Sequence, residues 1–134
     1  MQAWRVHRNG EPGEVMSLEE TDRPKPGDGQ VLVEVRAANV NFPDALLCRG
    51  QYQVRPPLPF TPGVEVCGTT EDGRRVLATP ALPHGGFAEY VVADEAALLP
   101  APDQAAGPVA ERQVDGDEVA VGQQFFLGGG QDHA

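Results

Sequence analysis

The stretch that decides the fold spans residues 39–92 and holds four short blocks. In chain order they are Asn41-Phe42-Pro43-Asp44, Arg49-Gly50-Gln51-Tyr52, Pro59-Phe60-Thr61-Pro62-Gly63-Val64-Glu65-Val66-Cys67-Gly68 and Gly85-Gly86-Phe87-Ala88-Glu89-Tyr90-Val91-Val92. Glycine or proline occurs in every block, and these residues separate short apolar segments. The pattern therefore predicts a protein of strands and loops, not a helical bundle.

The clearest strand prediction lies just before these blocks, at residues 31–38. Valine occupies every second position from 31 to 35, and leucine, glutamate and arginine alternate with it, which is the period of a half-buried strand. Residues 2–8 and 15–18 predict an opening hairpin or meander that ends at the turn cluster 23–29. The chain thus begins with β-structure.

One short helix is expected at residues 43–49. Pro43 suits the first helical position and Gly50 suits the C-terminal cap. Residues 55–62 hold four prolines and predict a loop or polyproline segment. The run Arg55-Pro56-Pro57-Leu58-Pro59 also fits, loosely, the pattern of a polyproline ligand.

Further short strands complete the expected fold. They are predicted around Val64 and Val66, at residues 75–78 beyond a turn at 71–73, and at residues 87–93 and 97–99. Phe87 and Tyr90 are expected to pack in the core. Many short strands at near-even spacing indicate a mainly β fold, a closed or partly closed barrel with one or two short helices.

Composition limits the possible partners. The 134 residues carry a formal net charge of −10, with a pI near 4.6. Such a chain repels phosphate backbones and anionic head groups, so we expect no nucleic-acid and no membrane partner. Cys48 and Cys67 form no Cys-x-x-Cys pair, and no signal segment or long apolar run is present. We expect a cytoplasmic protein with reduced thiols.

The only domain boundary that the composition supports lies near Asp103. Residues 1–103 form the expected globular domain, and residues 104–134 form an acidic, glycine-containing tail. Two more strands are conceivable in this tail, at residues 118–121 and 123–127. The run Gly128-Gly129-Gly130 follows, but it lacks the third glycine and the helix of a dinucleotide-binding turn. We therefore expect a flexible end there.

Taken together, the four blocks resemble the catalytic domain of the medium-chain dehydrogenase/reductases, most closely the zinc-independent quinone oxidoreductase branch. The resemblance covers residues 2–103. It implies a GroES-like, partly closed β-barrel and hydride transfer from NADPH to a quinone or an activated alkene. Residues 104–134 resemble neither the Rossmann domain nor the return segment of that family.

Metal binding is not expected. Cys48, Cys67, His7, His84 and His133 are far apart in sequence, whereas zinc needs three or four converging ligands. In zinc-dependent members of the resembled family, ligands stand at the positions that Asn41 and Val64 fill here. Their four-Cys lobe also has no counterpart in the short loop at residues 77–86. The resemblance thus implies a domain without zinc.

The same resemblance implies a site at the floor of a cleft, with Asn41, Asp44 and Tyr52 as its catalytic residues. Asn41 would hold the nicotinamide side of the cofactor, and Tyr52 would offer a hydroxyl or a ring to the substrate. An equally good explanation is that Asn41 and Asp44 form a helix cap. Gly63, Glu65 and Gly68 are assigned structural roles, and Glu65 is either paired or raised in pKa by burial.

Two functions from different classes remain open. In one, the chain is part of an oxidoreductase that needs a nucleotide-binding domain or partner chain, and it neither binds NADPH nor is active alone. In the other, it is a non-catalytic GroES-like barrel that binds a small molecule or a protein. In either case, an apolar face near Leu46 and Leu47 is expected to make the isolated chain dimerise or self-associate.

Overall fold

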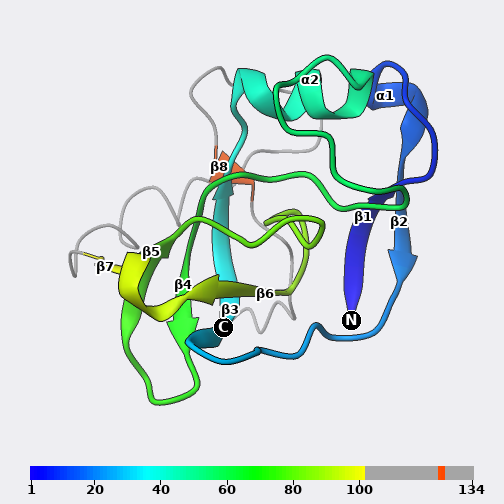
Figure 1. Ribbon diagram of the computed structural model, residues 1–134. Helices are drawn as coiled ribbons and strands as arrows, with labels where there is room; N and C mark the ends of the chain where they lie inside the picture. Colours follow the sequence, from blue (N-terminus) through cyan, green and yellow to red (C-terminus); the bar gives the residue numbers. More distant parts are fainter. Residues whose placement is uncertain (102–123, 126–134) are drawn as a thin grey trace, which may run out of the picture.

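A computed structural model describes residues 1–101 and the backbone of Gln124 and Phe125. The strand expected at residues 118–121 and the flexible end expected after it lie outside the described residues. Within the described part, two antiparallel sheets and two short helices make up the domain (Figure 1). The expected mainly β class with one or two short helices is confirmed.

The first sheet is the opening hairpin that the sequence predicts. Strand β1 (Gln2–Val6) pairs antiparallel with β2 (Met16–Glu20), so that Val6 lies opposite Met16. A short helix, α1 (Pro12–Val15), fills the connection between them. Val6 and Val15 are buried, which anchors the hairpin to the rest of the domain.

The second sheet has β3 at its centre. Its order is β6-β3-β4-β5-β7, and β8 also pairs with β3. The bounds are Gln30–Asn39 for β3, Val66–Thr70 for β4, Arg75–Ala78 for β5, Tyr90–Asp94 for β6, Leu99–Pro100 for β7 and Gln124–Phe125 for β8. A single-turn helix, Glu95–Ala97, joins β6 to β7.

Strand β3 confirms the strongest sequence prediction. Two side chains, Leu32 in β3 and Tyr90 in β6, differ from what the sequence predicts. Val33 and Val35 face the core, and Arg36 is exposed, as the alternation requires. Leu32 on the other face is buried as well, and it lines a shallow hollow together with Arg23 and Tyr90. The Arg23 guanidinium stacks over the Tyr90 ring at 3.8 Å, so Tyr90 is half-buried and faces that hollow instead of the main core.

The remaining strand predictions are right in kind and shifted at their ends. Strand β4 begins at Val66, so Val64 lies in the preceding loop. Strand β6 begins at Tyr90, although Phe87 is buried in the core as expected. In the Pro-rich segment, Phe60 is buried and the Pro59 carbonyl accepts a hydrogen bond from Arg5. Phe60 and the Pro59 carbonyl are thus tied to the fold, whereas Arg55, Pro57, Leu58 and Pro59 are exposed, so the polyproline-ligand interpretation stays an untested alternative.

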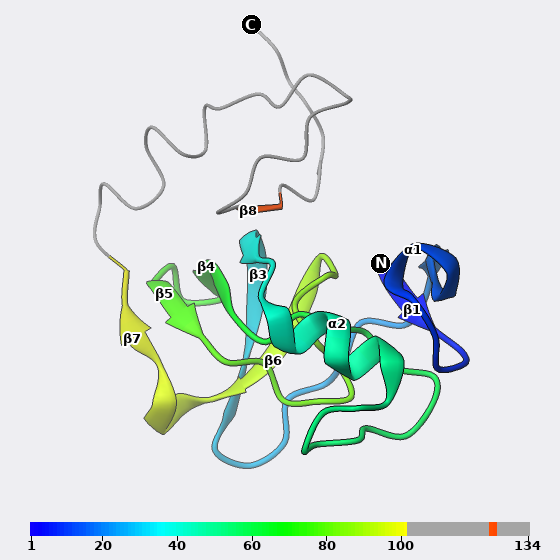
Figure 2. The same ribbon diagram turned by 90° about the horizontal axis from the view of Figure 1, so that it is seen from above.

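The two sheets lie side by side and do not form one closed barrel (Figure 2). Isolated bridges connect them, with Ala3 opposite Ala88 and Val6 opposite Phe60. Their side chains fill two buried clusters. One is built on the second sheet around Val33, and the other joins the hairpin to the second helix around Leu47.

That second helix, α2 (Phe42–Arg49), begins one residue before the expected start and ends where expected. Asn41 is its N-cap and Gly50 its C-cap, with a φ of 68°. Leu47 and Cys48 are buried beneath it, and Arg49 forms a two-pronged ion pair with Glu11 near α1. The helix is therefore fixed at both of its ends.

Gly68 allows β4 to approach β3 closely. It lies opposite Val35, where β3 bulges before Ala37. A Cβ atom at Gly68 would collide with the backbone carbonyl of Glu34 and with a methyl group of Val33. Backbone atoms of a central strand cannot move aside without breaking the ladder, so this position requires glycine.

We expect the change Gly68→Ala to lower the free energy of unfolding by about 3 kcal/mol, because a methyl group must be forced between two paired strands. Urea unfolding followed by circular dichroism measures this. Gly13→Ala is the matched control, since nothing lies within 4 Å of a Cβ atom there. Its expected effect is neutral or stabilising by up to about 1 kcal/mol. Equal effects of the two changes would contradict the close-approach argument.

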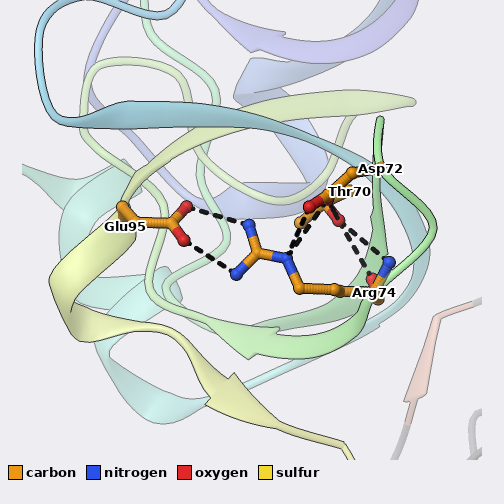
Figure 3. A network of polar contacts seen from close by, with 4 residues as sticks. All are labelled: Thr70, Asp72, Arg74 and Glu95. Carbon is orange, nitrogen blue, oxygen red and sulfur yellow. Dashed lines mark hydrogen bonds and ion pairs between the residues drawn. The ribbon is translucent and has the colours of Figure 1, made fainter.

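A polar network ties the β4–β5 turn to the helix after β6 (Figure 3). Arg74 donates two hydrogen bonds to Glu95, at 2.7 and 3.1 Å, and its Nε donates to Asp72 at 3.0 Å. The Thr70 hydroxyl also donates to Asp72. Hydrogen bonds from Thr70 and then Arg74 lower the pKa of Asp72, and those from Arg74 lower the pKa of Glu95.

These lowered pKa values predict an acid-sensitive contribution to stability. The contribution is present above the ordinary pKa values of 3.8 and 4.5 and is lost as pH falls through the lower folded-state values. The change Arg74→Gln should therefore destabilise the chain at about pH 7 and have less effect at about pH 3, as measured by thermal unfolding at low salt. Arg36→Gln, at the exposed pair with Glu34, is the control and should show no such trend. A constant effect of Arg74→Gln across pH would contradict this.

Candidate functional site

The candidate site is built around the carboxylate of Asp44 in the first turn of α2. Its Oδ2 accepts a hydrogen bond from the Asn41 backbone N–H at 2.8 Å, and its Oδ1 accepts one from the Gly63 N–H at 2.9 Å. The residue is only 4% exposed. One side chain thus joins two of the sequence blocks, the start of α2 and the Gly63 turn.

The Gly63 turn is in turn fixed to the glycine block at residues 85–87. The Gly63 carbonyl accepts a hydrogen bond from Gly86 at 2.8 Å, and the Pro62 carbonyl accepts one from Phe87 at 3.0 Å. Gly63 has a φ of 108°, and a Cβ atom there would lie 2.6 Å from the Gly86 nitrogen. Both the backbone angle and the space require glycine at this position. Asp44 therefore holds three separate segments in register.

Burial dominates the electrostatics of Asp44. Loss of solvent raises the pKa of its carboxyl group, and the backbone N–H donors of Asn41, Gly63 and Val64 oppose that rise. The group is an acceptor held by the fold, with little surface open to a ligand. The sequence assigned Asp44 to the catalytic set; its carboxylate is buried and bonded to two backbone N–H groups, and the catalytic role stays a prediction.

Asn41 stands beside Asp44 and is half-buried, so its side chain is accessible at the start of α2. Phe42 follows it and is 71% exposed, and Val40 before it is 41% exposed. The sequence reasoning missed Phe42. Helical spacing was the available signal, because Phe42 lies on the face opposite to that of buried Asp44, Leu47 and Cys48. An amide and an aromatic ring therefore lie together at the N-terminal end of α2.

Tyr52 lies beyond the other end of α2. It is half-buried and packs against the cluster that contains Leu47 and Phe60. The structure brings Asn41 and Asp44 into direct contact, and it leaves Tyr52 at the opposite end of the helix. These three residues thus border one helix instead of forming one hydrogen-bonded cluster.

Glu65 is exposed, so the alternative in which its carboxyl group is buried is wrong. The other alternative, that it is paired in the fold, is confirmed: its Oε2 accepts a hydrogen bond from the Asn39 side chain at 2.8 Å. The Asn39 backbone N–H also donates to the Glu65 carbonyl at 3.1 Å. This double contact ties the end of β3 to the segment between the Gly63 turn and β4.

No group of three or more His, Cys, Asp or Glu side chains that could hold a metal ion occurs among the described residues. Cys48 is buried, and loss of solvent and the nearby Asp44 charge raise the pKa of its thiol to about 11. Such a thiol is a poor metal ligand and a poor nucleophile near neutral pH. Freedom from zinc stays a prediction for the whole chain.

The exposed apolar surface lies elsewhere than the sequence suggested. Leu47 is only 1% exposed and supports the core, whereas Phe42 and Val40 are the large apolar side chains exposed at this end of α2. Leu47 therefore cannot contribute to the predicted apolar face, and self-association stays a prediction. Within the described residues, neither helix is long and apolar enough to span a lipid bilayer.

Comparisons with known proteins agree with this architecture. Residues 27–103 match the model of the alcohol dehydrogenase GroES-like domain. The chain is 39% identical to the quinone oxidoreductase of Sus scrofa over 113 residues, which covers 75% of this chain and 34% of that enzyme. It is also 40% identical, with a TM-score of 0.67, to the quinone oxidoreductase of Thermus thermophilus, which has been solved in complex with NADPH.

That Thermus match covers 77% of this chain and 33% of the bacterial enzyme. A mycobacterial protein solved in complex with NADPH is 35% identical, with a TM-score of 0.68, over 77% of this chain and 34% of its own. The chain therefore spans about a third of the length of these relatives. The family model covers residues 27–103, which include Asp44 and the two backbone N–H groups that donate to it, an arrangement that we call the Asp44 clamp.

We expect the change Asp44→Ala to lower the free energy of unfolding by about 2–4 kcal/mol, because it leaves the N–H groups of Asn41 and Gly63 buried without an acceptor. Urea unfolding gives the magnitude. Asp28→Ala, on an exposed turn, is the matched control and should stay within about 0.5 kcal/mol of the parent. If both variants unfold at the parent's midpoint, Asp44 is not the clamp.

Proposed function

Because the chain belongs to the alcohol dehydrogenase GroES-like domain family of the medium-chain dehydrogenase/reductases, we propose that it supplies the substrate side of an NADPH-dependent reductase. The proposed substrates are quinones and activated alkenes. The observation that carries this proposal is the 39% identity to a quinone oxidoreductase over 75% of the chain. The rival proposal of a non-catalytic binding module finds no support in the comparisons.

Asn41 and Phe42 fit the nicotinamide side of such a site. A nicotinamide offers a carboxamide to donors and acceptors and a flat ring to an aromatic neighbour. Asn41 carries both a donor and an acceptor, and Phe42 presents a ring that is 71% exposed. Asp44 acts through Asn41, by fixing its backbone at the start of α2. It is a positioning residue in this proposal.

The phosphate groups of NADPH need a separate binding structure, such as the glycine-rich turn of a dinucleotide-binding domain. Among residues 1–101, no turn from a strand into a helix carries a Gly-x-Gly-x-x-Gly run. The proposed enzyme thus takes its nucleotide-binding domain from another part of the same protein or from a partner chain. Exposed Phe42 and Val40 offer that domain an apolar contact.

In the reaction, bound NADPH supplies a hydride to the quinone or alkene carbon. The domain would orient the substrate and deliver a proton to the carbonyl oxygen that gains negative charge. Tyr52 is the proposed proton donor, because its hydroxyl is a neutral donor on the half-exposed side of the Leu47 cluster. We place the enzyme in the cytosol as part of the same proposal.

A domain graft tests the proposal. Residues 1–101 would replace the matching part of the Thermus thermophilus quinone oxidoreductase, which keeps that enzyme's nucleotide-binding domain. We expect the graft to oxidise NADPH in the presence of a benzoquinone. Tyr52→Phe should lower kcat about 100-fold, within the range for loss of a general acid. Gln53→Ala, on the adjacent exposed position, is the control and should keep parent activity.

The chain by itself should show no NADPH binding tighter than about 10 μM, because the phosphate cradle lies outside residues 1–101. Isothermal calorimetry measures this. A graft that folds and binds NADPH, yet reduces neither quinones nor conjugated alkenes, would overturn the proposed substrate class.

A further inference from the structure

One edge of strand β3 is covered by β6 over only part of its length. Strand β4 pairs with β3 along one edge, from Val33 to Ala38. On the other edge, β6 pairs with β3 only from Gln30 to Glu34. The last backbone hydrogen bond on that side is donated by the Val35 N–H to the Glu89 carbonyl. Beyond Val35, neither β4 nor β6 covers this edge.

An open edge at this place is a hazard for the chain. Unpaired N–H and C=O groups on a strand edge are a template for another strand. Here the edge leads directly to two exposed apolar side chains, Val40 at 41% and Phe42 at 71%. A second molecule could pair with the backbone and bury these side chains at the same time.

Strand β8 occupies this edge. It runs antiparallel to β3, with Phe125 opposite Ala38 and Gln124 opposite Asn39. Both views show β8 beside the end of β3 that leads into α2 (Figures 1 and 2). The segment comes from the tail after the GroES-like domain, and its sequence Gln123-Gln124-Phe125-Phe126-Leu127 holds both aromatic residues of that tail. The tail therefore carries a strand-forming run at the point where it meets the open edge.

We propose that this edge of β3 is a docking site for an extended segment, and that the chain's own Gln124–Phe125 segment is its resident. By backbone pairing, the segment closes the sheet beside Asn41 and denies the edge to a second copy of the chain. The proposal assigns the tail a role beyond the reductase reaction and does not depend on it.

The backbone geometry supplies a reporter for this contact. Successive N–H groups of an extended strand point to opposite edges. The Asn39 N–H donates to Glu65 on the β4 side, so the Ala38 N–H faces the edge that β8 occupies. Exchange of the Ala38 amide therefore senses β8, and exchange of the Asn39 amide is an internal reference for the rest of the sheet.

The experiment compares amide hydrogen exchange by NMR in the full chain and in its Phe125→Pro variant. Proline has no N–H and disrupts strand pairing, so Ala38 exchange should accelerate about tenfold while that of Asn39 stays unchanged. Val119→Pro places a proline elsewhere in the tail and should leave both amides unchanged. The parent pattern should not depend on protein concentration.

Three results would overturn the proposal. Unchanged Ala38 exchange in Phe125→Pro would mean that the segment does not close the edge. Protection of Ala38 that rises with concentration would mean that a second copy supplies the strand. Joint acceleration of Ala38, Asn39 and Val33 would mean that the segment supports the whole sheet and is not an edge cover.

Discussion

The buried carboxylate of Asp44 is the contact on which the arrangement of this domain depends. Its two oxygens accept backbone N–H groups from Asn41 and from Gly63, which are 22 positions apart in sequence. Burial of a carboxylate is costly unless such donors surround it, and the donors are themselves costly to bury without an acceptor. Each part of the contact therefore requires the others. This mutual need fixes the start of α2 against the turn that carries the glycine block at residues 85–87.

Glycine makes this arrangement sterically possible at two places. At Gly63 the backbone adopts a positive φ and passes within contact distance of Gly86. At Gly68 the strand approaches the bulge in β3 so closely that any side chain would strike a carbonyl. The first close approach positions the site, and the second holds the two central strands together. A domain of many short strands depends on such contacts, because no single element buries enough apolar surface to be stable alone.

The candidate site is a helix end and not a pocket closed within one domain. Asn41 is half-exposed and Phe42 is largely exposed at the N-terminal end of α2, beside the edge of β3 that pairs with β8. The relatives agree in this respect, since the chain matches about a third of their length. In the proposed reductase, this domain holds one side of the substrate or cofactor and another component holds the other.

The sequence alone determined most of the elements, although it did not predict α1 (Pro12–Val15). The valine alternation fixed β3, the proline and glycine positions fixed the ends of α2, and the ordered blocks identified the family, because each of these signals is local or is a pattern along the chain. It could not decide what Asp44 contacts, since Gly63 is distant in sequence and only the fold brings the two together. It left open whether Glu65 is paired or buried, and it wrongly placed Leu47 on an exposed face. Side-chain exposure depends on which segments pack over an element, and that is decided by tertiary structure alone.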